Sequence, residues 1–430
     1  MIQEYHDLSG DPSQGCRMMG AIRAFYGIQD GYVVLHSPPG CHSGAMLMNC
    51  MSDNTTMRIA LSGLHTRDLV FGAEERALIT LKKLDSTVHP KFMVLMDCCA
   101  SGIIGEDLPS MVEMAKNEGV QAALMYFKGI GFHGLMWQGY EDALTGLLEH
   151  MRPQKKTIEN SINLIGFLVD EPRSTADLRE IKRICSANGI HINSVLTSGN
   201  FSEIINAPAA ALNVVLDGDG LFLAKAMMDH FQIPYITVQY PYGFAGTNEF
   251  LTKISARLEV KLNTVFLQTE QRLIEKTLEK VKFYLWGLDG QPCAVIGTAG
   301  KAIALTRFLS EELGFEIPLL VLTSKNPTWE EQVDTIQGLA QTVLVEPDRK
   351  EMADRICATD INLIFGSSFE KKIAHLKGIP LVRFSYPIID NVSLTNSPYA
   401  GFRGIATWSE QIVNALFEYT SNKTRREVLV

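Results

Sequence analysis

The sequence predicts an α/β protein made of three doubly wound domains, each built on a parallel β-sheet. Its length of 430 residues suits about three domains of about 150 residues each. Short apolar runs alternate with longer amphipathic stretches along the whole chain. The runs are rich in β-branched residues and rarely interrupted by polar ones, which is typical of strands buried on both faces. Strand–helix alternation implies right-handed crossovers, so we expect Rossmann-like domains.

Each expected element follows from one of these two patterns. The apolar runs predict strands at residues 32–35, 92–96, 122–127, 163–168, 213–216, 235–238, 294–296, 319–322, 343–345, 362–365 and 381–384. The amphipathic stretches between them predict helices at residues 74–84, 108–117, 175–188, 220–231, 302–313, 329–339 and 409–419. The charged residues 269–282 are expected to form the solvent-exposed face of a further helical region.

Two polar turn segments divide the chain. Residues 151–157 and 287–292 each contain Pro, and each precedes a new strand. We therefore expect an N-terminal domain at residues 1–155, a middle domain at 156–286 and a C-terminal domain at 287–430. The chain has no short repeat that would instead indicate a solenoid.

Composition and charge exclude several classes of protein. Apolar residues make up 46% of the chain, which excludes wholesale disorder. With 39 Lys and Arg against 48 Asp and Glu, the net charge is −9, so we expect no binding to nucleic acid. No apolar run reaches the roughly 18 residues of a membrane helix, and the N-terminus does not resemble a signal peptide. We therefore expect no membrane association and a cytoplasmic location.

Three of the eight cysteines occupy positions that suit metal ligation. Cys41 and Cys99 each follow an expected strand and precede a helix, and Cys16 starts an amphipathic segment. The carboxyl edge of a parallel sheet is where α/β domains bind ligands. Helix N-termini are expected to lower the pKa of these thiols, and the thiolate is the form that binds metal. Gly40 leaves room for a bulky inorganic group beside Cys41.

The spacing of these thiols matches no zinc ribbon, ferredoxin run or Cys-x-x-Cys pair. Three thiolates are one short of the four that a cubane iron–sulfur cluster uses, which suggests that a partner chain completes the site. A buried, unreactive role for all three remains the alternative. Four further thiols are expected to be small buried side chains: Cys50, Cys185, Cys293 and Cys357.

Four motifs in order resemble those of the nitrogenase component 1 family. They are Asp-Pro-Ser-Gln-Gly-Cys-Arg-Met-Met-Gly-Ala at 11–21, His-Ser-Pro-Pro-Gly-Cys at 36–41, Leu-Val-Phe-Gly-Ala at 69–73 and Cys-Ala-Ser-Gly-Ile-Ile-Gly-Glu-Asp-Leu at 99–108. Residues 242–251 and 379–390 resemble later segments of the same family. The likeness covers essentially the whole chain and implies the three-domain fold of that family.

Within the family the chain resembles the β-type (K-type) subunit. The resemblance implies that Cys16, Cys41 and Cys99 supply half the ligands of a P-cluster-type 8Fe–7S cluster, with a 4Fe–4S cluster as the alternative. An α-type partner in an α2β2 heterotetramer would supply the other half and hold the catalytic cofactor. An ATP-dependent iron–sulfur reductase, itself a homodimer, would dock transiently and deliver electrons. Phe71 maps between that reductase and the cluster, although a core aromatic is the alternative.

Two further residues of the motifs are assigned by the same comparison. Cys98 stands where the family usually has Thr and is an alternative ligand to Cys99. His36 is interpreted as a hydrogen-bonding residue that orders its loop, not as a ligand. The chain has no Gly-x-x-x-x-Gly-Lys-Ser/Thr loop, so ATP chemistry is expected on the other component. Residues 297–301 are expected to form an ordinary strand-to-helix turn.

The chain is shorter than usual nitrogenase β subunits, which favours a nitrogenase-like reductase. Methylthio-alkane reductase, which cleaves C–S bonds of small thioethers, is the activity that the resemblance favours. The alternatives are nitrogenase proper, a tetrapyrrole reductase of the protochlorophyllide or nickel-sirohydrochlorin type, and a scaffold for cofactor assembly. A metal-free α/β ligand-binding protein is the alternative outside the family.

Overall fold

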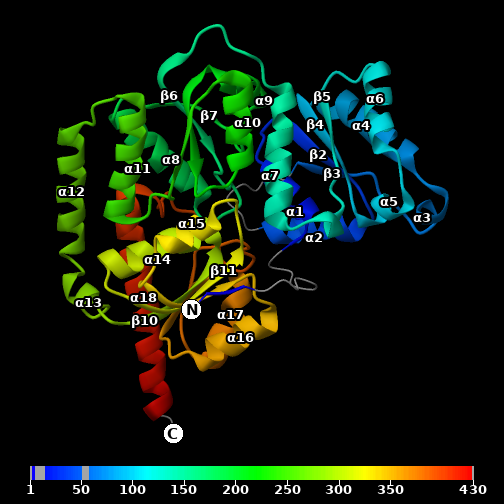
Figure 1. The fold of residues 1–430 in the computed structure, drawn as a ribbon. Helices are drawn as coiled ribbons and strands as arrows, with labels where there is room; N and C mark the ends of the chain where they lie inside the picture. The colour runs from blue at the N-terminus through cyan, green and yellow to red at the C-terminus, as the bar shows by residue number, and fades with distance from the viewer. Residues whose placement is uncertain (1, 5–14, 51–57, 429–430) are drawn as a thin grey trace.

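Three separate sheets, all of them parallel, form the framework of the protein (Figure 1). The structure is a computed structural model that describes residues 2–4, 15–50 and 58–428, with side chains for 15–50 and 58–417. Helices cover the sheets, and each sheet forms the centre of one α/β unit. The predicted fold class, three parallel-sheet α/β domains, is therefore confirmed.

The first sheet has its topological switch point between its two central strands. Its strand order is β3 (Ile59–Leu61), β2 (Gly31–His36), β4 (Phe92–Asp97) and β5 (Ala123–Phe127). The chain leaves β2 toward β3 on one side and returns to β4 on the other, so the loops after β2 and β4 diverge. Such a crevice at the carboxyl edge is the usual ligand site of an open α/β sheet. The helices of this unit are α1 (Arg17–Phe25), α2 (Pro39–Asn49), α3 (Asp68–Phe71), α4 (Glu74–Val88), α5 (Cys99–Ile104), α6 (Leu108–Asn117) and α7 (Met136–Gly146).

The second sheet has the same kind of order. Its strands are β7 (His191–Val195), β6 (Ile158–Ile165), β8 (Ala210–Leu216) and β9 (Tyr235–Val238). The associated helices are α8 (Ser174–Ala187), α9 (Phe201–Ile205), α10 (Leu221–Phe231), α11 (Gly243–Leu258), α12 (Thr264–Leu278) and α13 (Lys282–Trp286). The charged segment 269–282 thus lies mostly on α12, of which only Glu270 is buried.

The third sheet contains strands from both ends of the chain. Its order is β1 (Ile2–Glu4), β12 (Ala340–Val345), β11 (Glu316–Ser324), β10 (Pro292–Thr298), β13 (Leu363–Gly366) and β14 (Leu381–Arg383). Its helices are α14 (Ala299–Arg307), α15 (Trp329–Asp334), α16 (Arg349–Ala358), α17 (Lys371–Lys377) and α18 (Gly401–Val428). Helix α18 packs against α8, α11 and α12 of the preceding unit (Figure 1). The domain cuts after residues 155 and 286 stay a prediction.

The central strands are buried on both faces, as their unbroken apolar sequences predict. In β4, Val94 and Met96 contribute to the main core, whereas Met93 and Leu95 point to a second core under α4 and α6. Alternate residues of a strand face opposite sides, so both faces must be apolar when helices cover both. Among the described residues, no helix is both long and apolar enough to span a membrane.

Every expected strand overlaps an observed one, and β1, β3 and β7 were not expected. Strand β7 mixes His191, Asn193 and Ser194 with apolar residues, and β3 has only three residues, all half-buried, so neither gives a clear strand pattern. The helix expected at 329–339 ends at Asp334, and the one expected at 409–419 belongs to the longer α18. Short or half-exposed elements give weak periodicity, which explains these differences.

Candidate functional site

Four cysteines converge at the carboxyl edge of the first sheet, beside its switch point. Cys41 lies in the first turn of α2 after β2, and Cys99 begins α5 after β4. Cys98 is the N-cap of α5, and Cys16 is the N-cap of α1. The prediction that Cys16, Cys41 and Cys99 lie near helix N-termini is therefore confirmed. Residues 11–14 of the first motif lie outside the described residues.

Contacts with helix α7 bring Cys16 to this edge. The backbone N–H of Arg17 donates to the carbonyl of Gly134 at 3.1 Å, just before α7. Gly20 and Gly139 let α1 and α7 touch, because a Cβ on either would overlap the backbone of the other helix. This close crossing fixes the start of α1 beside the loop between β5 and α7.

The sulfur atoms of Cys16 and Cys99 both lie next to the backbone of Gly131. A Cβ added to Gly131 would lie 2.9 Å from Cys99 Sγ and 3.2 Å from Cys16 Sγ. The thiols of Cys41 and Cys98 hydrogen-bond to each other, and Cys16 and Cys99 are close enough to raise the pKa of Cys41. Residues far apart in the sequence thus form one thiol cluster.

Burial and mutual contact decide the acidity of these thiols. The hydrogen bond donated by Cys41 lowers the pKa of Cys98 to about 6 and raises the pKa of Cys41. Ser101 adds hydrogen bonds to Cys98, which also favour the Cys98 thiolate. Burial raises the pKa of Cys16, although backbone N–H groups at the start of α1 oppose that shift. The expected lowering of the pKa was therefore wrong for both Cys16 and Cys41. Desolvation outweighs the helix N-terminus at Cys16, and the hydrogen bond to Cys98 outweighs it at Cys41.

The donor set and its surroundings fit an iron–sulfur cluster. Cys16, Cys41 and Cys99 are partly exposed, whereas Cys98 is only 1% exposed. Among the described residues, a Cβ on Gly40 would meet nothing within 4 Å, so there is open space beside the backbone next to Cys41. In the described part of the chain no three His, Cys, Asp or Glu side chains are arranged around a single metal ion. That finding concerns one-ion sites, whereas in a cluster each thiolate binds a different iron.

Phe71 ends α3 on the surface, with its side chain 77% exposed. The alternative of a core aromatic is therefore wrong. Val70 beside it is 74% exposed, and Ile103 on the contacting helix α5 is 72% exposed. Exposed apolar side chains grouped on two contacting helices, one of which begins at Cys99, are typical of a protein interface.

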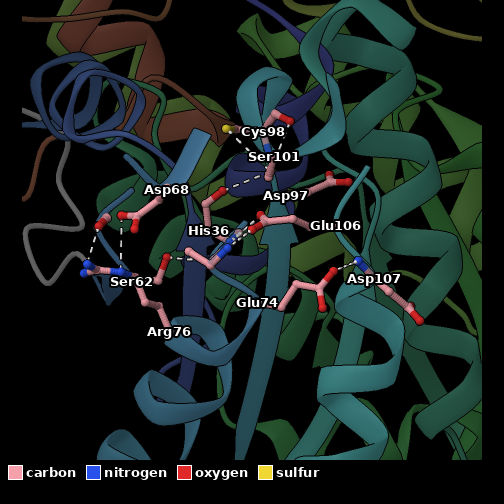
Figure 2. Close-up of polar contacts among 12 residues, drawn as sticks. His36, Ser62, Asp68, Glu74, Arg76, Asp97, Cys98, Ser101, Glu106 and Asp107 are labelled. Atoms are coloured by element: carbon pink, nitrogen blue, oxygen red, sulfur yellow. Dashed lines mark hydrogen bonds and ion pairs between the residues drawn. The ribbon is translucent and has the colours of Figure 1, made fainter. Parts of the chain in front are cut away.

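Buried polar residues hold the thiol-bearing loops in place, as Figure 2 shows. The imidazole of His36 contacts Glu106 Oε2 at 2.6 Å and the Ser62 hydroxyl at 2.8 Å. His36 therefore orders its loop by hydrogen bonding, as predicted. Asp97, at the end of β4, accepts hydrogen bonds from Gly129 and Tyr126 and so fixes the loop that carries Gly131.

Sequence reasoning did not assign Glu106, Ser62, Asp97 or Gly131 to the site. Glu106 lies inside the fourth motif, directly after Gly105, whose left-handed conformation ends α5. That position at the end of a ligand-bearing turn was the one sequence signal available. The roles of the other three depend on contacts between distant segments.

The remaining cysteines divide into two groups. Cys185 and Cys293 are fully buried, as expected, and burial raises the pKa of each. Cys50 and Cys357 are exposed, so the expectation of burial was wrong for both. Cys357 lies on the solvent side of α16, and Cys50 ends α2. Residues 297–301 form the turn from β10 into α14, as expected.

Replacing Gly131 by alanine is expected to disturb the thiol cluster directly. The new methyl group would overlap the sulfur of Cys99, and crowding of this kind costs about 1–3 kcal/mol of folding free energy. We expect a lower unfolding midpoint and less bound iron in anaerobically purified protein. Gly44→Ala is the matched control, because Gly44 lies in α2 and its Cβ would meet none of the described residues within 4 Å. Equal iron content in both variants would contradict the placement of Gly131.

Comparison with known proteins identifies the family. Residues 16–417 match the family model described as nitrogenase component 1 type oxidoreductase. The solved structure "Nitrogenase Cp1 at pH 6.5" superimposes with a TM-score of 0.84 at 22% identity, covering 97% of this chain and 95% of that one. This likeness supports the fold assignment.

Two kinds of relative share most of the length of the chain. The nitrogenase iron-molybdenum cofactor biosynthesis protein NifE of Clostridium pasteurianum is 29% identical over 384 residues, which cover 86% of this chain and 82% of that protein. One subunit of the light-independent protochlorophyllide reductase of Cyanophora paradoxa is 25% identical over 420 residues, which cover 93% of each chain. Together with the family match over residues 16–417, these findings show that the chain is a nitrogenase-like oxidoreductase and belongs to the nitrogenase component 1 family.

Proposed function

We propose that this chain is the β-type subunit of a nitrogenase-like two-component reductase. Cys16, Cys41 and Cys99 supply half the ligands of a P-cluster-type 8Fe–7S cluster at the interface with an α-type partner. The assembly is an α2β2 heterotetramer in the cytoplasm, and an ATP-dependent iron–sulfur reductase docks on it. The convergence of these three partly exposed thiols at the switch point of the first sheet is the observation that carries the proposal.

The chain's own residues hold and insulate the site. The three helix starts present the thiols, and their free N–H groups favour negative charge there. Cys98 and Ser101 are buried on the inner side of the three partly exposed thiols, so they keep water away from that side of the site. The partly exposed side of the thiol cluster is left for the partner subunit. When bound, an iron–sulfur cluster accepts and passes on single electrons.

The substrate proposed is a small thioether. In methylthio-alkane reduction, two electrons and two protons break one C–S bond and give an alkane and methanethiol. This chain contributes the electron path, and the partner's cofactor would bind the thioether. The family assignment supports this activity only through analogy with nitrogenase-like reductases.

Two relatives favour specific second candidates. The likeness to NifE, which is named for cofactor biosynthesis, favours a scaffold that holds cluster precursors. The likeness to a protochlorophyllide reductase chain favours a tetrapyrrole reductase with a 4Fe–4S cluster. The scaffold predicts cluster binding without substrate reduction, and the tetrapyrrole reductase predicts a lower iron count.

The experiment that tests the proposal is an anaerobic purification of the chain with its α-type partner. We expect about eight cluster irons per interface, against about four for a tetrapyrrole reductase. With the reductase and ATP, ethyl methyl sulfide is expected to yield methanethiol. Iron without reduction of any thioether, dinitrogen or tetrapyrrole would favour the scaffold. Colourless, iron-free complex would refute the cluster itself.

A further inference from the structure

Glu106 connects the surface that carries Phe71 to the loops that carry the cysteines. Its side chain is 3% exposed, and each carboxylate oxygen has a separate partner. Oε2 contacts His36 Nε2 at 2.6 Å, and Oε1 accepts the backbone N–H of Ala73 at 2.5 Å. Ala73 lies two residues after Phe71, and His36 ends β2, five residues before Cys41. One buried carboxylate therefore spans the two segments.

Glu106 is also connected, through the backbone of α5, to the loop that carries Cys98 and Cys99. Glu106 follows Gly105, the left-handed C-cap of α5, and α5 begins with Cys99. The carbonyl of His36 accepts a hydrogen bond from Ser101 at 3.1 Å, and Ser101 Oγ accepts one from the N–H of Cys98 at 2.9 Å. In Figure 2, dashed lines join His36 to Ser101 and to Glu106. A continuous series of hydrogen bonds therefore connects Cys98 to Ala73, in the loop after α3.

Helix α3 is short and is held mainly at its two ends. It has four residues, and its last two, Val70 and Phe71, are largely exposed. Asp68 anchors its start through the N–H of His65 and an ion pair with Arg76. At its end, Gly72 has a left-handed φ of 79°, and Ala73 is tied to Glu106. Without that tie, the end of α3 would gain conformational freedom.

We propose that Glu106 is a positioning residue for reductase docking. It holds Phe71 at a fixed place relative to the thiol loops, so that the docked reductase meets a preformed surface at a set distance from the cluster. This inference rests on the proposed function, because it requires a docking partner. A loop that must first be ordered binds its partner more weakly, which gives the expected direction.

The first test needs no reductase and concerns the loop alone. In Glu106→Ala, hydrogen exchange at the amides of residues 68–73 is expected to accelerate by about tenfold or more, since the Ala73 amide loses its buried acceptor. Glu113→Ala is the matched control, because that carboxylate is 67% exposed on α6 and pairs with Lys116 of the same helix. Unchanged exchange in Glu106→Ala would overturn the proposal even if the cluster assignment holds.

The second test is a double-mutant cycle in the complete complex, with the ATP-dependent reductase of the same organism as the probe. Glu106→Ala is expected to raise the half-saturating reductase concentration about tenfold. In a Phe71→Ala background the same change is expected to have little effect, because Glu106 acts through Phe71. Iron content is measured beside it, because Glu106 also contacts His36 in a thiol-bearing loop. The rate of cluster reduction by titanium(III) citrate, per iron present, is expected to stay at the wild-type value, since that reagent does not dock.

The outcomes separate this inference from the proposed function. Equal effects of Glu106→Ala in both backgrounds, or slower reduction by titanium(III) citrate, would overturn the positioning role. If Glu106→Ala loses iron, the cycle is repeated with Glu106→Gln, which keeps an acceptor for Ala73 but removes the anion beside His36. Because the acceptor for Ala73 is kept, the half-saturating concentration is expected to stay near the wild-type value there, and a tenfold rise would overturn the positioning role through Ala73. Iron-free wild-type complex would instead refute the proposed function.

Discussion

Replacing Cys16, Cys41 or Cys99 by alanine, one at a time, is expected to remove most of the iron from the assembled complex and to abolish reductase-dependent turnover. Each thiol comes from a different helix start, so no neighbouring thiol on the same turn can replace Cys16 or Cys41. Loss of one thiolate leaves an iron without its protein ligand. Iron and acid-labile sulfide per complex, measured after anaerobic purification, give the result directly.

Controls come from cysteines outside the cluster. Cys357→Ala changes an exposed thiol, and Cys185→Ala changes a buried one, so together they report the effects of losing a thiol at the surface and in the core. Both variants are expected to retain wild-type iron. Full iron content in all three cluster variants would contradict the ligand assignment.

Cys98 provides a separate comparison at the same site. It neighbours Cys99, and it is buried against Ser101 and Cys41. We expect Cys98→Ala to retain iron and Cys99→Ala to lose it. The reverse result would exchange the roles of the two residues without changing the location of the cluster.

Replacing Arg23 by methionine is expected to cost about 3–5 kcal/mol of folding free energy, the largest stability effect that we expect in the molecule. Arg23 lies on α1 and is 4% exposed. Its guanidinium pairs with Asp170 at 2.5 and 2.9 Å and with Glu171 at 3.1 Å, and it lies 4.2 Å from the Tyr386 ring centre. Methionine keeps the length of the side chain but leaves two buried carboxylates unpaired.

The same ion pair joins parts of the molecule that carry different sheets. Burial alone lowers the pKa of Arg23, but Asp170 and Glu171 outweigh it and hold that pKa above its ordinary value. Glu171 also accepts the N–H of Tyr386, which follows β14. We therefore expect Arg23→Met to loosen the start of α1, and with it Cys16, in addition to lowering overall stability.

Denaturant unfolding midpoints measure this effect. Lys82→Met is the control, because the Lys82–Glu118 pair is 49% and 40% exposed and is expected to contribute less than about 1 kcal/mol. Adding Asp170→Asn and Glu171→Gln to Arg23→Met is expected to restore part of the lost stability, since the cost comes from unpaired charge. Similar midpoints for Arg23→Met and Lys82→Met would contradict the assigned burial.

The sequence determined the fold class and the position of two thiols at the edge of a sheet. Unbroken apolar runs such as that of β4 record burial on both faces, and they alternate with amphipathic segments. A cysteine directly after such a run must lie at the carboxyl edge of the sheet, which is why Cys41 and Cys99 could be placed without coordinates. These inferences succeed because they depend on near neighbours in the chain.

Only the tertiary structure decided which distant groups meet. It set Cys16 against Cys99 over Gly131, exposed Phe71, joined β1 to β12, and tied Glu106 to Ala73. It also reversed the expected acidity of Cys41, since a hydrogen bond to a neighbouring thiol outweighs a helix end. Desolvation and contact between segments far apart in sequence are properties of the packed molecule, and local periodicity carries no record of them.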